Sequence, residues 1–300
     1  MKRVIYILGT SFSGSTLLNH LLDQQPGIRG LSEAHNWFRD SQAYCPKCKG
    51  RAMDCPNYQK FAGKGDFWNL QFAEYPDSHT LVASTKYPEA SWGIVPKPDA
   101  TVTCGVIILS KTPHSFAWSA LRHNPENNPL RAMRSWYHTH KNILWSLDDA
   151  ATGQRTTPWS ATYTPPPISP RDVAVVTYQA LATQPHETVE AICTHFGLKY
   201  TRPASLFTPS DTCMLGGNNA LYAQAVADDA FFAQDSQYLD GKYRGKKGLV
   251  FLDEQWRGNR TFTAECQAAY NDPQLRKLLA VCEKIGYESV EWLEQDLHKG

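Results

Sequence analysis

Short apolar runs alternate with amphipathic stretches along most of the chain. Runs rich in β-branched residues predict buried strands at Arg3–Leu8, Thr80–Ser84, Val106–Ser110 and Asp172–Tyr178. Apolar residues at helical spacing predict helices over Leu17–Asp23, Ser115–Arg122, Leu130–Leu147, Glu187–Phe196, Leu275–Ile285 and Val290–Leu297. Strands that alternate with helices are typical of an α/β protein, so we expect a central parallel sheet flanked by helices in three layers.

Three segments interrupt this alternation and predict loops. Cysteines lie in a polar loop at 40–60, and proline and threonine are concentrated in a loop or lid at 152–171. The segment 207–260 is long, rich in glycine and aromatic residues, and poorly periodic, and such loops are more often functional than not. We expect a single domain over residues 1–300 that carries these three loops.

Composition narrows the classes of partner. Lysine and arginine number 30 and aspartate and glutamate 29, so no bulk charge favours a nucleic acid or a membrane surface. No stretch approaches the roughly 20 apolar residues of a membrane-spanning helix. We therefore expect a cytoplasmic protein without nucleic-acid or membrane partners, in which the eight cysteines are reduced. The oligomeric state stays open.

The segment Gly9–Thr16 is the main candidate binding element, because it follows the first predicted strand and precedes the first helix. Backbone N–H groups of such a loop and the helix dipole together favour an anion such as phosphate. The loop approaches a Walker A motif, but Ser15 stands where that motif requires lysine. Hydrolysis of ATP or GTP is therefore disfavoured, although a small-molecule kinase stays as an alternative.

The first 35 residues resemble the sulfotransferase superfamily. The resemblance lies in Ser13–Leu18, in Pro26 and in Ser32–His35. It implies a P-loop-like fold and the donor 3′-phosphoadenosine 5′-phosphosulfate (PAPS), which leaves as adenosine 3′,5′-bisphosphate (PAP). The residues implied to bind the 5′-phosphosulfate are Ser11, Phe12, Ser13, Gly14, Ser15 and Thr16. Phe12 departs from the family, which usually has arginine or lysine there, so a non-catalytic nucleotide-binding protein is a second alternative.

Later motifs follow in the order that the resemblance implies. Lys111 and Ser119 resemble the family's 3′-phosphate motif, with lysine in place of arginine, so a point charge replaces a bidentate fork. Tyr178 resembles a tyrosine near the nucleotide and could stack on adenosine or hydrogen-bond to it. Gly217 and Asn218 resemble the family's C-terminal nucleotide loop, which places the segment 207–260 near the nucleotide or the acceptor.

Sulfuryl transfer to a hydroxyl or an amine needs a base, because the acceptor loses a proton as the S–O or S–N bond forms. Glu33 and His35 follow the first helix, and Ser32-Glu33 resembles a Gly-Glu pair in which the glutamate is the base. We favour Glu33 over His35, although histidine needs less pKa adjustment. Lys86 resembles the lysine of the family's Ser-Lys-x-Pro stretch, and a cation there could stabilise the charge that grows on the bridging oxygen as PAP leaves. It is also the best substitute for the cation missing at Phe12. The acceptor is expected to be a small molecule.

Cys45, Cys48 and Cys55 could supply three zinc ligands, with His35 or another residue as the fourth. No second paired Cys-x-x-Cys motif is present, and two such pairs are the usual signature of a zinc site. We therefore expect free thiols or a disulfide here, and no metal in the protein.

Overall fold

The computed structural model describes residues 1–40, 42–45, 47–48, 50–153, 163–206, 212–216 and 254–283. Several sequence-based predictions lie outside these residues: the nucleotide-binding residues Gly217 and Asn218, the helix Val290–Leu297, and much of the two loops at 152–171 and 207–260.

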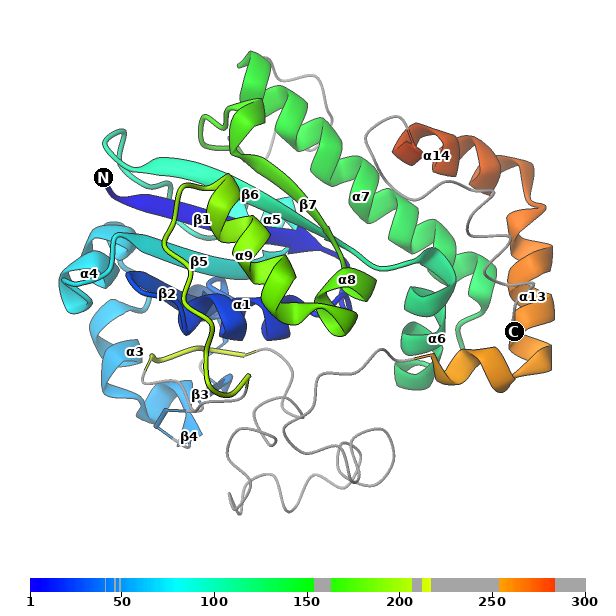
Figure 1. The fold of residues 1–300 in the computed structure, drawn as a ribbon, viewed down its shortest axis with the longest axis horizontal. Coiled ribbons are helices and arrows are strands. Elements are labelled where there is room, and N and C mark those ends of the chain that lie inside the picture. The colour runs from blue at the N-terminus through cyan, green and yellow to red at the C-terminus, as the bar shows by residue number, and fades with distance from the viewer. Residues whose placement is uncertain are drawn as a thin grey trace.

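A five-stranded parallel sheet forms the centre of the molecule (Figure 1), and this confirms the predicted α/β fold class. The strand order is β2-β5-β1-β6-β7, with every neighbouring pair parallel. The strands span Arg3–Gly9 (β1), Ile28–Ser32 (β2), Thr80–Lys86 (β5), Thr103–Ser110 (β6) and Val173–Thr177 (β7). After β1 the chain adds β2 and β5 on one side and then β6 and β7 on the other. The order therefore switches at β1, and ligands of such sheets bind at the carboxyl edge near the switch.

Helices cover both faces of the sheet (Figure 1). Those that the structure describes are α1 (Ser15–Asp23), α2 (Asn36–Arg39), α3 (Pro56–Phe61), α4 (Phe67–Glu74), α5 (Pro88–Gly93), α6 (Pro113–His123), α7 (Pro129–Thr152), α8 (Tyr178–Thr183), α9 (Pro185–His195), α13 (Arg260–Tyr270) and α14 (Pro273–Glu283). Prolines occupy the first turn of α6, α7 and α9, where their missing N–H costs no hydrogen bond. None of the helices in the described ranges is long and apolar enough to span a membrane.

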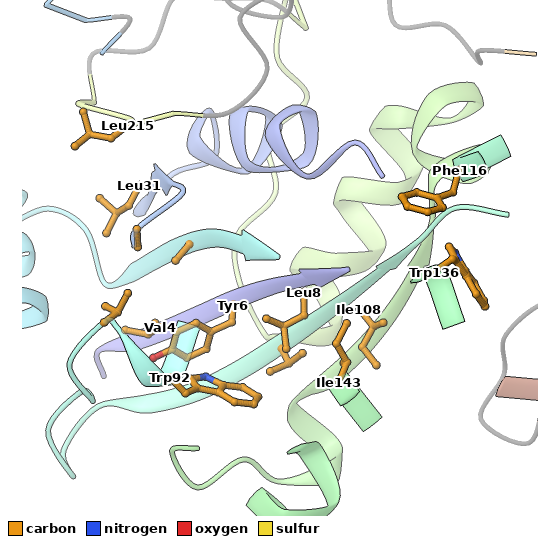
Figure 2. Packing of buried hydrophobic residues seen from close by; sticks show 14 of the residues in the cluster. Val4, Tyr6, Leu8, Leu31, Trp92, Ile108, Phe116, Trp136, Ile143 and Leu215 are labelled. Atoms are coloured by element: carbon orange, nitrogen blue, oxygen red, sulfur yellow. The ribbon is translucent and has the colours of Figure 1, made fainter. Parts of the chain in front are cut away.

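Strand β1 separates two hydrophobic cores, because alternate side chains of a strand point to opposite faces. Ile5 and Ile7 pack with α1 and α9, whereas Tyr6 and Leu8 pack with α5 and α7 on the other face. Figure 2 shows the second core, where Tyr6 lies beside Trp92 of α5. Strand β1 is therefore packed on both faces, and this fixes the position of the candidate phosphate loop that follows it.

The segment 40–60 contains more regular structure than the predicted polar loop. It forms a short hairpin of β3 (Tyr44–Cys45) and β4 (Gly50–Arg51), then a 3₁₀ turn, η1 (Ala52–Asp54), and the helix α3. Cys45, Cys55 and Phe61 are fully buried. These anchors are too few and too widely spaced to produce a periodic signal, so the sequence pattern alone indicated a loop.

Candidate active site at the carboxyl edge of the sheet

Predicted site residues follow the carboxyl ends of all five parallel strands. The loop Thr10–Thr16 follows β1 and Glu33 follows β2, while Lys86 ends β5. Lys111 follows β6 and Tyr178 follows β7. Because the strands are parallel, these five ends lie along one edge of the sheet, and residues as far apart in sequence as Thr10 and Tyr178 are brought to the same region.

The loop after β1 is shaped by two glycines. Gly14 is the N-cap residue of α1 with a φ of 92°, and an added Cβ would lie 2.9 Å from the Tyr178 ring. At Gly9 an added Cβ would lie 2.3 Å from the Leu109 carbonyl oxygen, so the loop begins where only glycine fits. The buried Ser13 hydroxyl donates to the Thr10 carbonyl at 2.8 Å and closes the turn. With glycine at its N-cap, α1 presents its first N–H groups without a capping side chain, as an anion site requires.

Lys111, Ser119 and Tyr178 form one cluster beside this loop. The Lys111 Nζ donates to the Ser119 Oγ at 2.9 Å and lies 4.7 Å from the centroid of the Tyr178 ring. Lys111 is only 3% exposed, although it carries a charge. Its carbonyl accepts a hydrogen bond of 2.6 Å from the Trp136 indole, a positioning contact that the sequence did not reveal. Three of the predicted nucleotide-binding residues therefore lie together, and Tyr178 connects them to Gly14.

Glu33 and Lys86 form an ion pair in which Lys86 Nζ donates to Glu33 Oε1. Both side chains are largely buried, with 13% of Glu33 and 18% of Lys86 exposed. The Asn36 amide approaches the other carboxylate oxygen at 3.4 Å. The residue after Lys86 is Tyr87, whose hydroxyl is hydrogen-bonded to Ser11 Oγ at 2.8 Å. Two predicted catalytic residues are thus in direct contact, and Tyr87, which sequence reasoning missed, ties them to the phosphate loop.

His35 lies at the start of α2, close enough to this ion pair for both charges to affect it. Burial lowers the pKa of His35 from its ordinary value, Glu33 raises it, and Lys86 lowers it further. Its buried Nδ1 has no hydrogen-bond partner among the residues that the structure describes. A neutral imidazole with an open nitrogen can accept a proton, so Glu33 and His35 are both chemically able to act as the base.

The Phe12 side chain packs against helix α6. Its ring stacks on the His123 imidazole, with centroids 4.4 Å apart, and it is 38% exposed. It has a positive φ of 63°, and Ser32 (54°) and Lys86 (69°) are the other non-glycine residues with positive φ in the described ranges. All three lie at the carboxyl edge of the sheet. Such conformations cost about 1–3 kcal/mol each and cluster at functional sites.

The segment 212–216 lies against the end of β2 although it is about 180 residues away in sequence. Leu215 forms a parallel bridge with Ser32, and its carbonyl accepts from the Glu33 N–H at 3.1 Å. The Ser32 hydroxyl donates to the Gly216 carbonyl at 3.1 Å. The segment therefore holds the backbone at Glu33, and nothing in its local sequence pattern predicted this contact.

Comparison with known proteins identifies one family. The family model described as the sulfotransferase family matches residues 4–202, about two thirds of the 300 residues. The match includes every predicted site residue except Gly217 and Asn218. No curated protein matches this chain.

Solved structures with similar folds include three sulfotransferases of low sequence identity. The sulfotransferase domain of the curacin biosynthetic pathway is 14% identical, with a TM-score of 0.46, and the match covers 72% of this chain and 84% of that one. The domain of the Synechococcus PCC 7002 olefin synthase is 18% identical, also with a TM-score of 0.46, and the match covers 78% and 84%. Mouse SULT7A1, complexed with PAP, is 9% identical, with a TM-score of 0.37, and the match covers 94% and 88%.

Proposed function

This chain belongs to the sulfotransferase family, and we propose that it transfers the sulfonate of PAPS to a hydroxyl or an amine of a small-molecule acceptor. The observation that carries this proposal is the Glu33–Lys86 ion pair, held at the same sheet edge as the phosphate loop. A base for the acceptor and a cation for the departing phosphate are the two charges that sulfuryl transfer requires.

The residues at this edge fit a nucleotide that carries phosphate groups at both its 5′ and 3′ positions. The loop Ser11–Thr16 and the start of α1 would hold the 5′ side through backbone N–H groups and hydroxyls. Thr10 Oγ1 is buried and has no hydrogen-bond partner in the described part of the chain. An oxygen atom of a bound ligand would supply that partner. Lys111 and Ser119 would hold the 3′-phosphate, and Tyr178 offers an aromatic face to adenosine. Gly217 and Asn218 are proposed to complete the site.

The chain's own residues supply acid–base chemistry and electrostatics. Bound PAPS provides the electrophilic sulfur and a bisphosphate leaving group. The Glu33 carboxylate removes the proton of the acceptor, and His35 is the alternative base for that step. Lys86 supplies a positive charge next to the loop. It takes the place of the arginine or lysine that the family usually has at position 12. The low exposure of both charged side chains strengthens their electrostatic effect, because less water screens them.

Transfer of radiolabelled sulfonate from PAPS to a panel of small hydroxyl and amine compounds tests the proposal. We expect at least one acceptor to be labelled, and the reaction to be inhibited by PAP. Binding of PAP without transfer to any acceptor would instead indicate a nucleotide-binding protein without chemistry. Stronger thermal stabilisation by ATP than by PAP would favour a kinase.

A cytoplasmic location is part of the proposal. None of the seven cysteines whose side chains the structure describes forms a disulfide, which agrees with a reducing compartment.

A further inference from the structure

Four cysteines from distant parts of the chain converge beside the active site. Cys45, Cys48 and Cys55 are joined by Cys213, and all four sulfur atoms lie within 4.8 Å of one another. The Sγ–Sγ separations are 3.3 Å for Cys48–Cys55, 3.6 Å for Cys55–Cys213 and 3.9 Å for Cys48–Cys213. These three separations lie within about 0.5 Å of the edges of a tetrahedron around one zinc ion, which are about 3.8 Å for Zn–S bonds of about 2.3 Å.

The sequence showed only three of these ligands. Cys213 lies 158 residues beyond Cys55, so the spacing rule for paired Cys-x-x-Cys motifs does not find it. The fourth ligand atom is the sulfur of Cys213 and not a ring nitrogen of His35, the residue that the sequence had offered for that place. With four ligands in place, the main reason for expecting no metal is removed.

Three of the four cysteines lie on one small unit of the chain. Cys45 and Cys48 belong to the β3–β4 hairpin and its turn, and Cys55 precedes α3. The hairpin has only two residue pairs, and so small a unit is marginally stable without a cross-link.

We propose that Cys45, Cys48, Cys55 and Cys213 bind one structural zinc ion in a closed, tetrahedral, all-thiolate site. Four sulfur ligands select zinc or iron, and a span of 4.8 Å has room for a single ion but not for a cluster of several iron and sulfide atoms. A site with four protein ligands leaves no position for substrate, so the zinc is structural. Binding releases up to four thiol protons and leaves the site with a charge of −2.

Zinc at this position would clamp the segment 212–216 onto the end of β2. The Gly216 N–H donates to the Tyr44 carbonyl in β3 at 3.2 Å, and the Leu215 carbonyl accepts from the Glu33 N–H at 3.1 Å. Figure 2 shows Leu215 in the same core as Leu31. Backbone hydrogen bonds on either side of Leu215 and Gly216 therefore connect the hairpin to Glu33, the proposed base. Both bonds lie within three residues of Cys213 or Cys45, two of the proposed ligands. The significance for catalysis rests on the proposed function, whereas the metal site itself does not.

Metal analysis of the protein purified under reducing conditions tests the site. We expect about one zinc per chain in the wild type, and less than about a fifth of that in Cys48→Ser, which changes the exposed ligand. Cys193→Ala, a buried cysteine in α9 outside the cluster, is the matched control and should keep its zinc. Metal-free protein with reactive cluster thiols, a disulfide within the cluster, or iron in place of zinc would each overturn the proposal.

A chelator applied to the wild-type protein gives a second test that does not depend on how a variant folds. Removal of zinc should increase the hydrogen exchange rate of the Glu33 amide at least tenfold, because its acceptor Leu215 is then no longer held by Cys213. An unchanged exchange rate in zinc-free protein would show that zinc does not hold the segment 212–216 against the end of β2. Neither measurement uses sulfonate transfer, so the metal proposal and the proposed function fail independently.

Discussion

Individual residues at the carboxyl edge have separable roles that substitution can isolate. Glu33 and Lys86 form an ion pair at the ends of the neighbouring strands β2 and β5. Lys111 instead contacts the hydroxyl of Ser119 and the ring of Tyr178. The first pair bears on proton removal and charge at the reacting group, and the second on recognition of the nucleotide.

Glu33→Gln should lower turnover by ~10²–10⁴, the usual contribution of a general base. Glutamine keeps the size and the hydrogen-bonding capacity of the side chain but cannot take the proton. Affinity for PAP, measured by calorimetry, should be little changed, because the loop that binds the donor does not include Glu33. His35→Ala should cost much less, mainly in the KM for the acceptor. The opposite ranking of the two variants would assign the base to His35.

Lys111→Ala should remove the preference for PAP over AMP. Loss of one charge-assisted hydrogen bond corresponds to about 1.5–3 kcal/mol, or roughly a ten- to hundredfold change in Kd. The wild type should therefore bind PAP at least tenfold more tightly than AMP, and the variant should bind both about equally. Lys64→Ala, which removes an exposed lysine elsewhere, is the charge-matched control. If the preference for PAP persists in Lys111→Ala, the 3′-phosphate is bound by other residues.

Whole elements explain why these residues meet. Each parallel strand ends at the same edge, and three of those ends carry a non-glycine residue with positive φ. The packing of the strand interiors offsets the backbone strain at these residues. The strands are buried from Val4 to Leu8 in β1 and from Val106 to Leu109 in β6. Helix α1 then begins directly from the strained loop, so the geometry of one turn determines where its N–H groups point.

Gly14→Ala should weaken PAP binding more than tenfold through the start of α1. Its φ of 92° strains any other residue, and the added methyl group would collide with Tyr178 at 2.9 Å. Gly63→Ala is the matched control, because Gly63 has a φ of 69° but no atom within 4 Å of its added Cβ. Both variants should lose stability from backbone strain, measured by denaturant unfolding, but only Gly14→Ala should lose nucleotide affinity. Equal affinity losses would show that strain and not the loop is responsible.

At the scale of the whole molecule, two buried histidines make stability depend on pH. Burial lowers the pKa of His20 and of His140 to about 4. Between pH 6.5 and pH 4 the unfolded chain binds protons at these residues and the folded chain does not. The free energy of unfolding is therefore unaffected by them above pH 6.5 and decreases as the pH falls towards 4.

The expected loss at pH 5, relative to pH 7, is about 2 kcal/mol for each of these histidines. His140→Gln should lessen the decline by about that amount, as measured by urea unfolding at the two pH values. Glutamine can replace the 2.9 Å hydrogen bond between the imidazole and the Trp136 carbonyl. His195→Gln, at an exposed position, should leave the decline unchanged. An identical pH dependence in wild type and His140→Gln would contradict the assignment.

The sequence by itself determined those features that depend on neighbouring residues. The apolar run before Gly9 fixes β1, glycine at position 14 fixes the turn, and the leucines that follow fix α1. Lys111 and Ser119 could be paired in advance from the resemblance, which implies a serine at the eighth position after the cation, and the structure places the two side chains in contact. The family could also be inferred at this level, because its most specific motif lies within one strand, one turn and one helix.

Only the tertiary structure decided the contacts between distant segments. The Glu33–Lys86 ion pair, the packing of Tyr178 on Gly14 and the approach of Cys213 to Cys55 join residues 53, 164 and 158 positions apart. Hydrophobic periodicity identifies which face of an element is buried but not which other segment it packs against. Cys213 illustrates this limit, because it lies in an aperiodic segment and acquires a chemical role only when β2 and the β3–β4 hairpin bring three other sulfur atoms to it.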